Sequence, residues 1–122
     1  MPSAVTQALS VQATTTTTQS AAGGTGNGTS IALAASTEDV SILVSGGVAT
    51  IVVECSFDSG STWETVAVTT IASGAVGGTI TSALGAARYL VWPPAGATNL
   101  RTRISAFVSG AITAVCIERR RP

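Results

Sequence analysis

The stretch Ser56-Phe57-Asp58-Ser59-Gly60-Ser61-Thr62-Trp63 follows residues 48–57, in which apolar and polar side chains alternate as they do in a β-strand. The carboxylate of Asp58 can fold back onto the amides of the turn, as in an Asx-type cap. Gly60 supplies the positive φ that such a loop often needs. Thr62 is a β-branched strand start, and Trp63 is a large apolar anchor for the loop. The stretch therefore predicts a β-hairpin with a structural turn formed by these four residues.

The spacing S-x-D-x-G-x-T-W resembles, position for position, the Asp-box (bacterial neuraminidase repeat) hairpin. Sialidases carry several Asp boxes on a β-propeller, which has roughly four to eight blades of four strands each. A chain of 122 residues with one copy cannot form a propeller. The active site of that family also lies away from its Asp boxes, so the resemblance implies a structural turn rather than a reaction. A loop tip that touches sugar or a protein partner is the alternative.

Alternating apolar and polar residues recur along the chain from Thr29 onward. About eight short segments of this kind, with turns of Gly, Ser and Asn between them, predict an all-β fold, a single antiparallel β-sandwich with a jelly-roll-like arrangement. Ser45-Gly46-Gly47 is predicted to be a hairpin turn and Ser109-Gly110 another turn. Tyr89 and Trp92 are expected to pack in the core, and a stacking patch beside Arg88 is the alternative.

Residues 1–28 are predicted to be a separate part of the chain, an extended N-terminal arm followed by a Gly-rich linker. The segment contains no charged residue, is rich in Thr, and becomes rich in Gly over residues 21–28. Residues 29–122 are predicted to form the sandwich domain. We expect the arm to become ordered on a neighbouring molecule, with simple disorder as the alternative. Its predicted partner contacts are Val5, Leu9 and Val11.

Charged residues make up 10% of the chain, against roughly 25% in typical soluble domains. We therefore predict that partner molecules cover much of the surface. Residues 1–87 carry five acidic residues and no base, whereas residues 88–122 carry six arginines and one Glu. This asymmetry suits docking between unlike surfaces. Alternatively, the two parts interleave in one sheet and their charges cancel locally.

The residue types that catalysis needs are scarce. Because the chain has no His and no Lys, no nucleophile–base pair can be assembled from its abundant Ser and Thr. Metal ligation lacks His and any cluster of Cys. Glu54, Asp58 and Glu64 flank one hairpin, but a carboxylate in the position of Asp58 is normally engaged with its own turn. We predict no enzyme, no catalytic residue, no cofactor, no metal and no small-molecule substrate.

Arg119, Arg120 and Arg121 form the one basic cluster of the sequence. Three arginines without a neighbouring aromatic platform are a weak nucleic-acid site, so no nucleic-acid partner is predicted. They are expected to contact a partner protein or to be solvated. No apolar run approaches the roughly 18 residues of a membrane helix, so no membrane partner is predicted. Cys55 and Cys116 are expected to be buried free thiols, with a disulfide as the alternative.

Residues 29–118 resemble, in layout, small β-sandwich structural proteins of tailed bacteriophages. The features that carry this resemblance are the hairpin of residues 54–63, the segment 94–103 and the closing segment 108–115. The resemblance implies a non-enzymatic virion component that is assembled in the host bacterial cytoplasm.

Within this class we predict a capsid decoration (cement) protein that forms a homo-oligomer. Its predicted partner is the major capsid protein or another virion protein. One alternative is another phage structural part, such as a tail, baseplate or head-fibre base. The other is a carbohydrate-binding module, which would need several exposed aromatic residues on one face.

Overall fold

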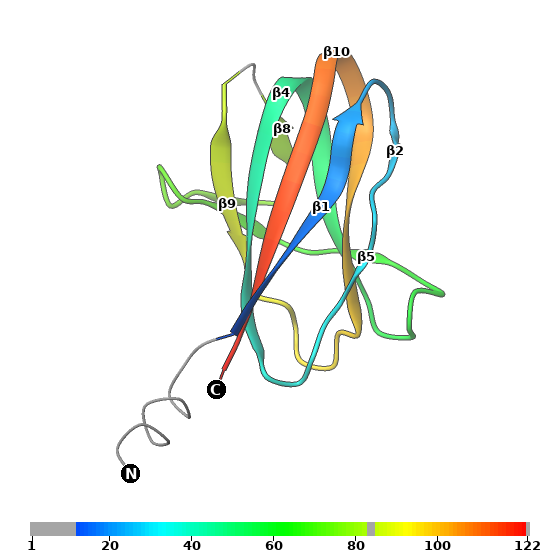
Figure 1. Cartoon of the computed structure of the whole chain (residues 1–122), viewed down its shortest axis with the longest axis vertical. Helices are drawn as coiled ribbons and strands as arrows, with labels where there is room; N and C mark the ends of the chain where they lie inside the picture. The colour runs from blue at the N-terminus through cyan, green and yellow to red at the C-terminus, as the bar shows by residue number, and fades with distance from the viewer. Residues whose placement is uncertain (1–11, 83–84, 122) are drawn as a thin grey trace.

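The computed structural model describes residues 12–82 and 85–121. Every regular element in these residues is a β-strand, so the all-β prediction is confirmed. The strands pair into a single antiparallel sheet (Figure 1). They are β1 (Gln12–Ala22), β2 (Gly26–Asn27), β3 (Ile31–Ala32), β4 (Thr37–Ser56), β5 (Glu64–Thr65), β6 (Val68–Thr70), β7 (Val76–Gly77), β8 (Ile80–Ser82), β9 (Ala87–Val91) and β10 (Asn99–Arg120).

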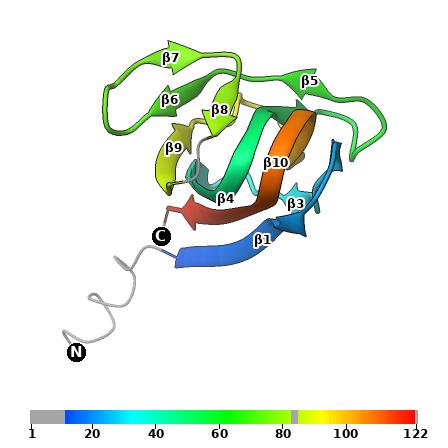
Figure 2. The same ribbon diagram turned by 90° about the horizontal axis from the view of Figure 1, so that it is seen from above.

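The long strands β4 and β10 form an antiparallel ribbon at the centre of the sheet, paired from Asn99↔Ser56 to Arg120↔Thr37. The first half of β4 also pairs with β9, and its second half pairs with β5 and β8. The second half of β10 pairs with β1, and its first half pairs with β2 and β3. The ribbon bends midway, so its two halves face each other (Figures 1 and 2). A single bent ribbon thus forms the layered arrangement.

Glycines on both strands make this bend possible. Gly46 has a φ of 97° and Gly110 a φ of 91°, and Gly47 is the register partner of Gly110. A Cβ on Gly46 would lie 2.1 Å from the carbonyl oxygen of Ala111, and a Cβ on Gly110 would lie 2.6 Å from that of Gly46. The prediction of turns at Ser45-Gly46-Gly47 and Ser109-Gly110 is wrong. The glycines let two strands approach closely and bend while their pairing continues.

Part of the predicted arm and linker lies in the sheet. β1 pairs with β10 from Gln12↔Arg120 to Ala22↔Ile112. Thr18 and Gln19 are buried, and their side chains donate hydrogen bonds to the carbonyls of Ala114 and Thr102, respectively. The predicted boundary after residue 28 therefore separates β1 from the strand with which it pairs. The β-branched threonines of β1 fit a strand, and the partner strand lies about 100 residues away in the sequence. Val5, Leu9 and Val11 lie outside the described residues.

The core is mainly aliphatic and comes from both halves of the ribbon. Each fully buried Val, Ile or Leu contributes roughly 1.5–3 kcal/mol relative to exposure. Cys55 and Cys116 are buried in this core as free thiols, and burial raises the pKa of both to about 11. The main members from β4 and β10 are Val40, Ile42, Val44, Ala49, Ile51, Val53, Leu100, Ile104, Ile112 and Ala114.

Candidate partner-binding surface

The turn between β4 and β5 is organised by the carboxylate of Asp58. Its Oδ1 accepts hydrogen bonds from the amide of Thr62 at 2.8 Å and the hydroxyl of Ser56 at 2.7 Å, and its Oδ2 accepts from the hydroxyl of Thr62 at 2.7 Å. These donors, the Thr62 hydroxyl foremost, favour the charged carboxylate and lower the pKa of Asp58 to about 2. Gly60 has a φ of 96° in the same turn. Asp58 is therefore fully engaged by its own loop.

The indole of Trp63 packs against this turn and is partly buried. Its Nε1 donates a hydrogen bond to the carbonyl of Gly60 at 3.1 Å. The guanidinium carbon of Arg101 lies 4.2 Å from the ring centroid, within cation–π range. Arg101 and Arg103 both pair with the buried carboxylate of Glu54, at 2.9 and 3.3 Å. These contacts fix Trp63 to β10 and favour a structural role for it.

The arginines near the C-terminus also find partners within the chain. Arg119 pairs with Asp39 and Glu38, and Arg120 pairs with Glu118 at 3.2 Å. The pairs of Arg119, Arg101 and Arg103 join acids of the first part of the chain to arginines of the second, whereas both members of the Arg120–Glu118 pair lie in the second part. The charges therefore cancel locally, as expected if the two parts interleave in one sheet.

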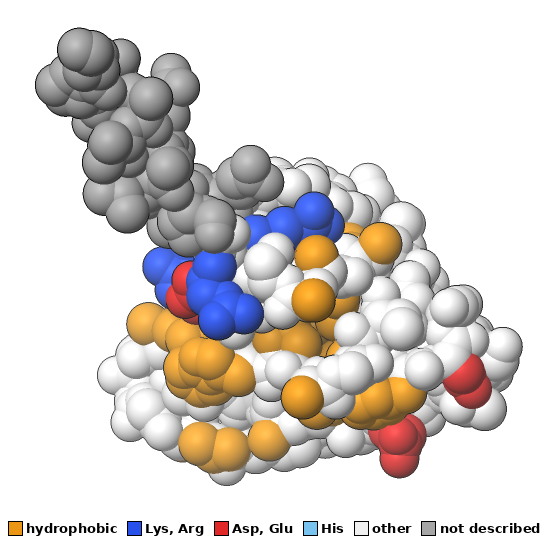
Figure 3. Space-filling view, turned by 90° about the horizontal axis from the view of Figure 1, so that it is seen from below, with side chains coloured by type: hydrophobic (Ala, Val, Ile, Leu, Met, Phe, Trp, Pro, Cys, Tyr) orange, Lys and Arg blue, Asp and Glu red, His pale blue; other side chains and the backbone are white. Residues whose placement is uncertain are grey.

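An exposed apolar surface lies at the end of the molecule where three connections meet: β3 to β4, β4 to β5, and β9 to β10 (Figure 1). We call it the end surface. Trp92 is 59% exposed and Phe57 43% exposed. Figure 3 views this end and shows hydrophobic side chains gathered beside a group of arginines. Exposed apolar patches of this kind mark interaction sites. The end surface consists of Leu33, Phe57, Trp92, Pro93, Pro94 and Ala97.

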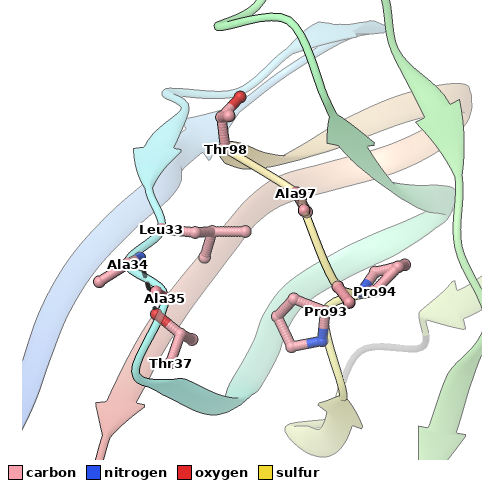
Figure 4. A pocket seen from close by; sticks show the side chains of 10 residues that line it. Leu33, Ala34, Ala35, Thr37, Pro93, Pro94, Ala97 and Thr98 are labelled. Atoms are coloured by element: carbon pink, nitrogen blue, oxygen red, sulfur yellow. Dashed lines mark hydrogen bonds between the residues drawn. The ribbon is translucent and has the colours of Figure 1, made fainter.

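The end surface is hollowed by a shallow cavity of about 300 Å³ (Figure 4). One side is lined by Leu33, Ala34, Ala35 and Thr37, where the Thr37 hydroxyl accepts a hydrogen bond from the amide of Ala34 at 2.9 Å. Residues 93–98 line the other side. The lining is mostly Pro, Ala and Leu, so the cavity fits an apolar side chain of a partner better than a charged ligand.

Sequence reasoning missed the exposure of Trp92, which was expected in the core. Tyr89 and Val91 occupy the inward positions of β9 and are buried. The alternation of side chains along a strand then directs the next residue outward. Pro93 follows at once and ends the strand, because it has no amide hydrogen to donate. The signal that could have predicted this exposure is the dipeptide Trp92-Pro93 directly after Val91, a residue that points inward.

The described residues offer little for other kinds of site. They contain no group of three or more His, Cys, Asp or Glu side chains that could hold a metal ion. In the same part of the chain, no helix has the length and apolar character needed to cross a membrane.

No protein-family model matches the chain, and no curated protein matches it in sequence. Among solved structures, the fold is similar to that of the SPBc2 prophage-derived protein YomS, with a TM-score of 0.72 and 16% identity over 90% of this chain and 95% of YomS. It is also similar to the PBSX exported protein XepA, with a TM-score of 0.73 and 9% identity over 90% of this chain. The chain spans 38% of the length of XepA. At these identities the likeness establishes a shared fold.

Proposed function

We propose that this chain is a non-enzymatic structural protein of a bacteriophage particle. The proposal is supported by the fold that the chain shares, over 95% of the neighbour's length, with a protein described as prophage-derived. It is also supported by the small number of charged residues, because a particle component buries surface that a solitary protein exposes to water. The location that follows is the virion.

The end surface is the observation that carries a binding role. It combines two exposed aromatic side chains, Trp92 and Phe57, with a cavity whose lining includes Pro93 and Pro94. Trp is enriched among residues that dominate binding energy, and such residues often lie beside pockets that exclude water. Prolines are already restricted in conformation, so little entropy is lost when they are buried. The end surface therefore suits a protein partner.

Within this class we propose a capsid decoration protein that places its end surface on the assembled head. The partner is then the major capsid protein or another shell protein. A protein that binds the assembled shell but not loose subunits stabilises the shell by mass action. The mechanism is associative and requires no bond-making step by any residue of the chain.

Mass spectrometry of purified particles tests this proposal. The copy number of the chain is measured relative to that of the major shell subunit. Hundreds of copies in each particle support decoration, whereas a handful assigns the chain to the tail or baseplate. Absence of the chain from particles that contain every other structural protein overturns the proposal.

A further inference from the structure

The sheet order β1-β10-β4-β9-β6-β7 ends at β1 on one side and at β7 on the other. β1 is 11 residues long, whereas β7 has two. One edge of β1 pairs with β10. On the other edge, among the described residues, the carbonyl of Thr18 accepts a backbone hydrogen bond from the amide of Thr29 at 2.9 Å. Residues 12–17 therefore present an open strand edge.

This edge lacks the features that normally keep sheet edges from pairing with other molecules. Proteins protect their edges with short strands, charged side chains, prolines or bulges. Residues 12–17 contain no charge, no Pro and no Gly, and the first register shift of β1 comes after Thr17. The short strands β2, β3, β5 and β7 have two residues each, which is too few to act as a template.

We propose that residues 13–17 of β1 pair antiparallel with the same segment of a second copy of this chain. The two-fold axis that relates two antiparallel neighbouring strands is perpendicular to the sheet. The outer faces of the two copies therefore lie on the same side of the extended sheet. Residues of equal parity then face each other. With the axis at Thr15, Thr14 lies opposite the partner's Thr16, and Ala13 lies opposite the partner's Thr17. Cross-strand Thr pairs of this kind are favourable.

The charged residues of the neighbouring strand lie at one end of the open edge. Arg119 and Arg120 of β10 lie beside Ala13 and Gln12, at one end of the open edge, and Val115 lies beside Thr17 at the other end. The two-fold axis places the arginines of each copy next to the partner's Val115 end. A parallel arrangement would instead bring Glu118, Arg119 and Arg120 of both copies to the same end of the seam.

A second copy suits the edge better than a foreign strand does. The same segment supplies a strand of equal length that is equally neutral, with backbone amides and carbonyls that can pair with those of the first copy. The pairing is independent of the proposed phage function, since purified chain alone suffices to form it. Loss of particle binding would leave the pairing intact.

Disulfide trapping tests the pairing. Facing residues on antiparallel strands have Cα atoms about 4.5–5.5 Å apart, within the roughly 4.4–6.8 Å that a disulfide spans. We expect the full chain with Thr15→Cys to form a covalent dimer on mild oxidation. The native Cys55 and Cys116 are buried and do not compete. Thr81→Cys, exposed on β8, is the matched control and should stay monomeric. Equal dimer fractions in the two variants would overturn the proposal.

Mixed variants test the register. Ala13→Cys and Thr17→Cys together should give a covalent heterodimer in several-fold excess over either homodimer. Without cross-linking, Thr15→Lys should weaken the dimer several-fold in sedimentation, because like charges face each other. Mixing it with Thr15→Glu should restore dimerisation. Homodimers in statistical proportion, or identical sedimentation of Thr15→Lys and the unmodified chain, would contradict this pairing.

Discussion

Asp58 shows how one carboxylate can specify a turn through hydrogen bonds to residues that are close to it in the sequence. Its two oxygens take hydrogen bonds from Ser56 and Thr62, all within a few residues along the chain. Because these contacts are local, the spacing of the residues was sufficient to predict them. The same contacts engage both oxygens of the carboxylate within the turn, and this is the physical reason for assigning the turn a structural role.

The depressed pKa of Asp58 makes the contribution of this turn depend on pH. A carboxyl whose pKa is lower in the folded state stabilises the fold above its unfolded pKa, roughly 3.9, and loses this effect as the pH falls through its folded pKa of about 2. We expect Asp58→Asn to melt at a lower temperature than the unmodified chain at neutral pH. The difference should shrink as the pH falls from about 4 toward 2. Thermal melts over this range measure it, and Glu64→Gln in the same hairpin is the control. A pH-independent difference would show that charge is not the cause.

The thiols of Cys55 and Cys116 are a second case in which burial decides chemistry. Burial raises the pKa of both to about 11, so thiolate is scarce in the folded protein at pH 8. We expect a disulfide reagent such as 5,5′-dithiobis(2-nitrobenzoic acid) to label both only as fast as the protein unfolds. Labelling should become immediate in denaturant. Thr81→Cys should add one rapidly reacting thiol to the folded protein, and rapid labelling of the unmodified chain would contradict the burial.

At the scale of elements, the bend of the β4–β10 ribbon determines the architecture. Without it, the two halves of the ribbon would form a flat sheet with one exposed apolar face. Gly46, Gly47 and Gly110 meet across the two strands and allow the backbones to approach more closely than any side chain would permit. The core therefore depends on three residues that contribute no apolar surface of their own.

Replacing Gly46 by Ala should destabilise the protein by about 2–5 kcal/mol, since a left-handed backbone strains Ala and its Cβ would clash with the carbonyl of Ala111. Gly23→Ala is the matched control. A Cβ on Gly23 would meet no atom within 4 Å, and the residue has no positive φ, so its replacement should change the free energy of unfolding by less than about 1 kcal/mol. Urea denaturation of both variants measures the difference. Equal stability of the two would mean that the bend tolerates a side chain.

Features that depend on residues close in the sequence could be predicted. Features that depend on pairing with a strand far away in the sequence could not. The Asp58 turn and the alternation of β4 were predictable from local spacing. A Gly-Gly pair is equally suited to a hairpin turn or a bend, and the choice at Gly46-Gly47 depends on Gly110 in the facing strand. The threonines of β1 have strand propensity, but their place in the sheet depends on β10. The exposure of Trp92 required knowing which face of β9 is buried.

At the scale of the whole molecule, the ion pairs and the apolar surfaces divide the exterior into different kinds of region. Arg101 and Arg103 share the carboxylate of Glu54, Arg119 pairs with Asp39, and Arg120 pairs with Glu118. These ion pairs weaken the field with which the arginines could attract a partner. The end surface and the open edge of β1 contain no charged residue, and they are the two regions to which we assign binding of another molecule. Two such regions on one small protein are what a component needs to contact both a copy of itself and a shell.

The end surface yields the last prediction. Trp92→Ala should weaken binding of the chain to phage heads that lack it by about tenfold or more, because the indole is exposed and directly precedes Pro93 of the cavity lining, so a partner bound there can shield the ring from water. Its melting temperature should barely change, since the ring is mostly outside the core. Val76→Ala, which removes an equally exposed apolar side chain from β7, should bind normally. Cosedimentation of each purified variant with heads measures the binding. If Val76→Ala is impaired as much as Trp92→Ala, binding depends on general apolar exposure, and the end surface loses its assigned role.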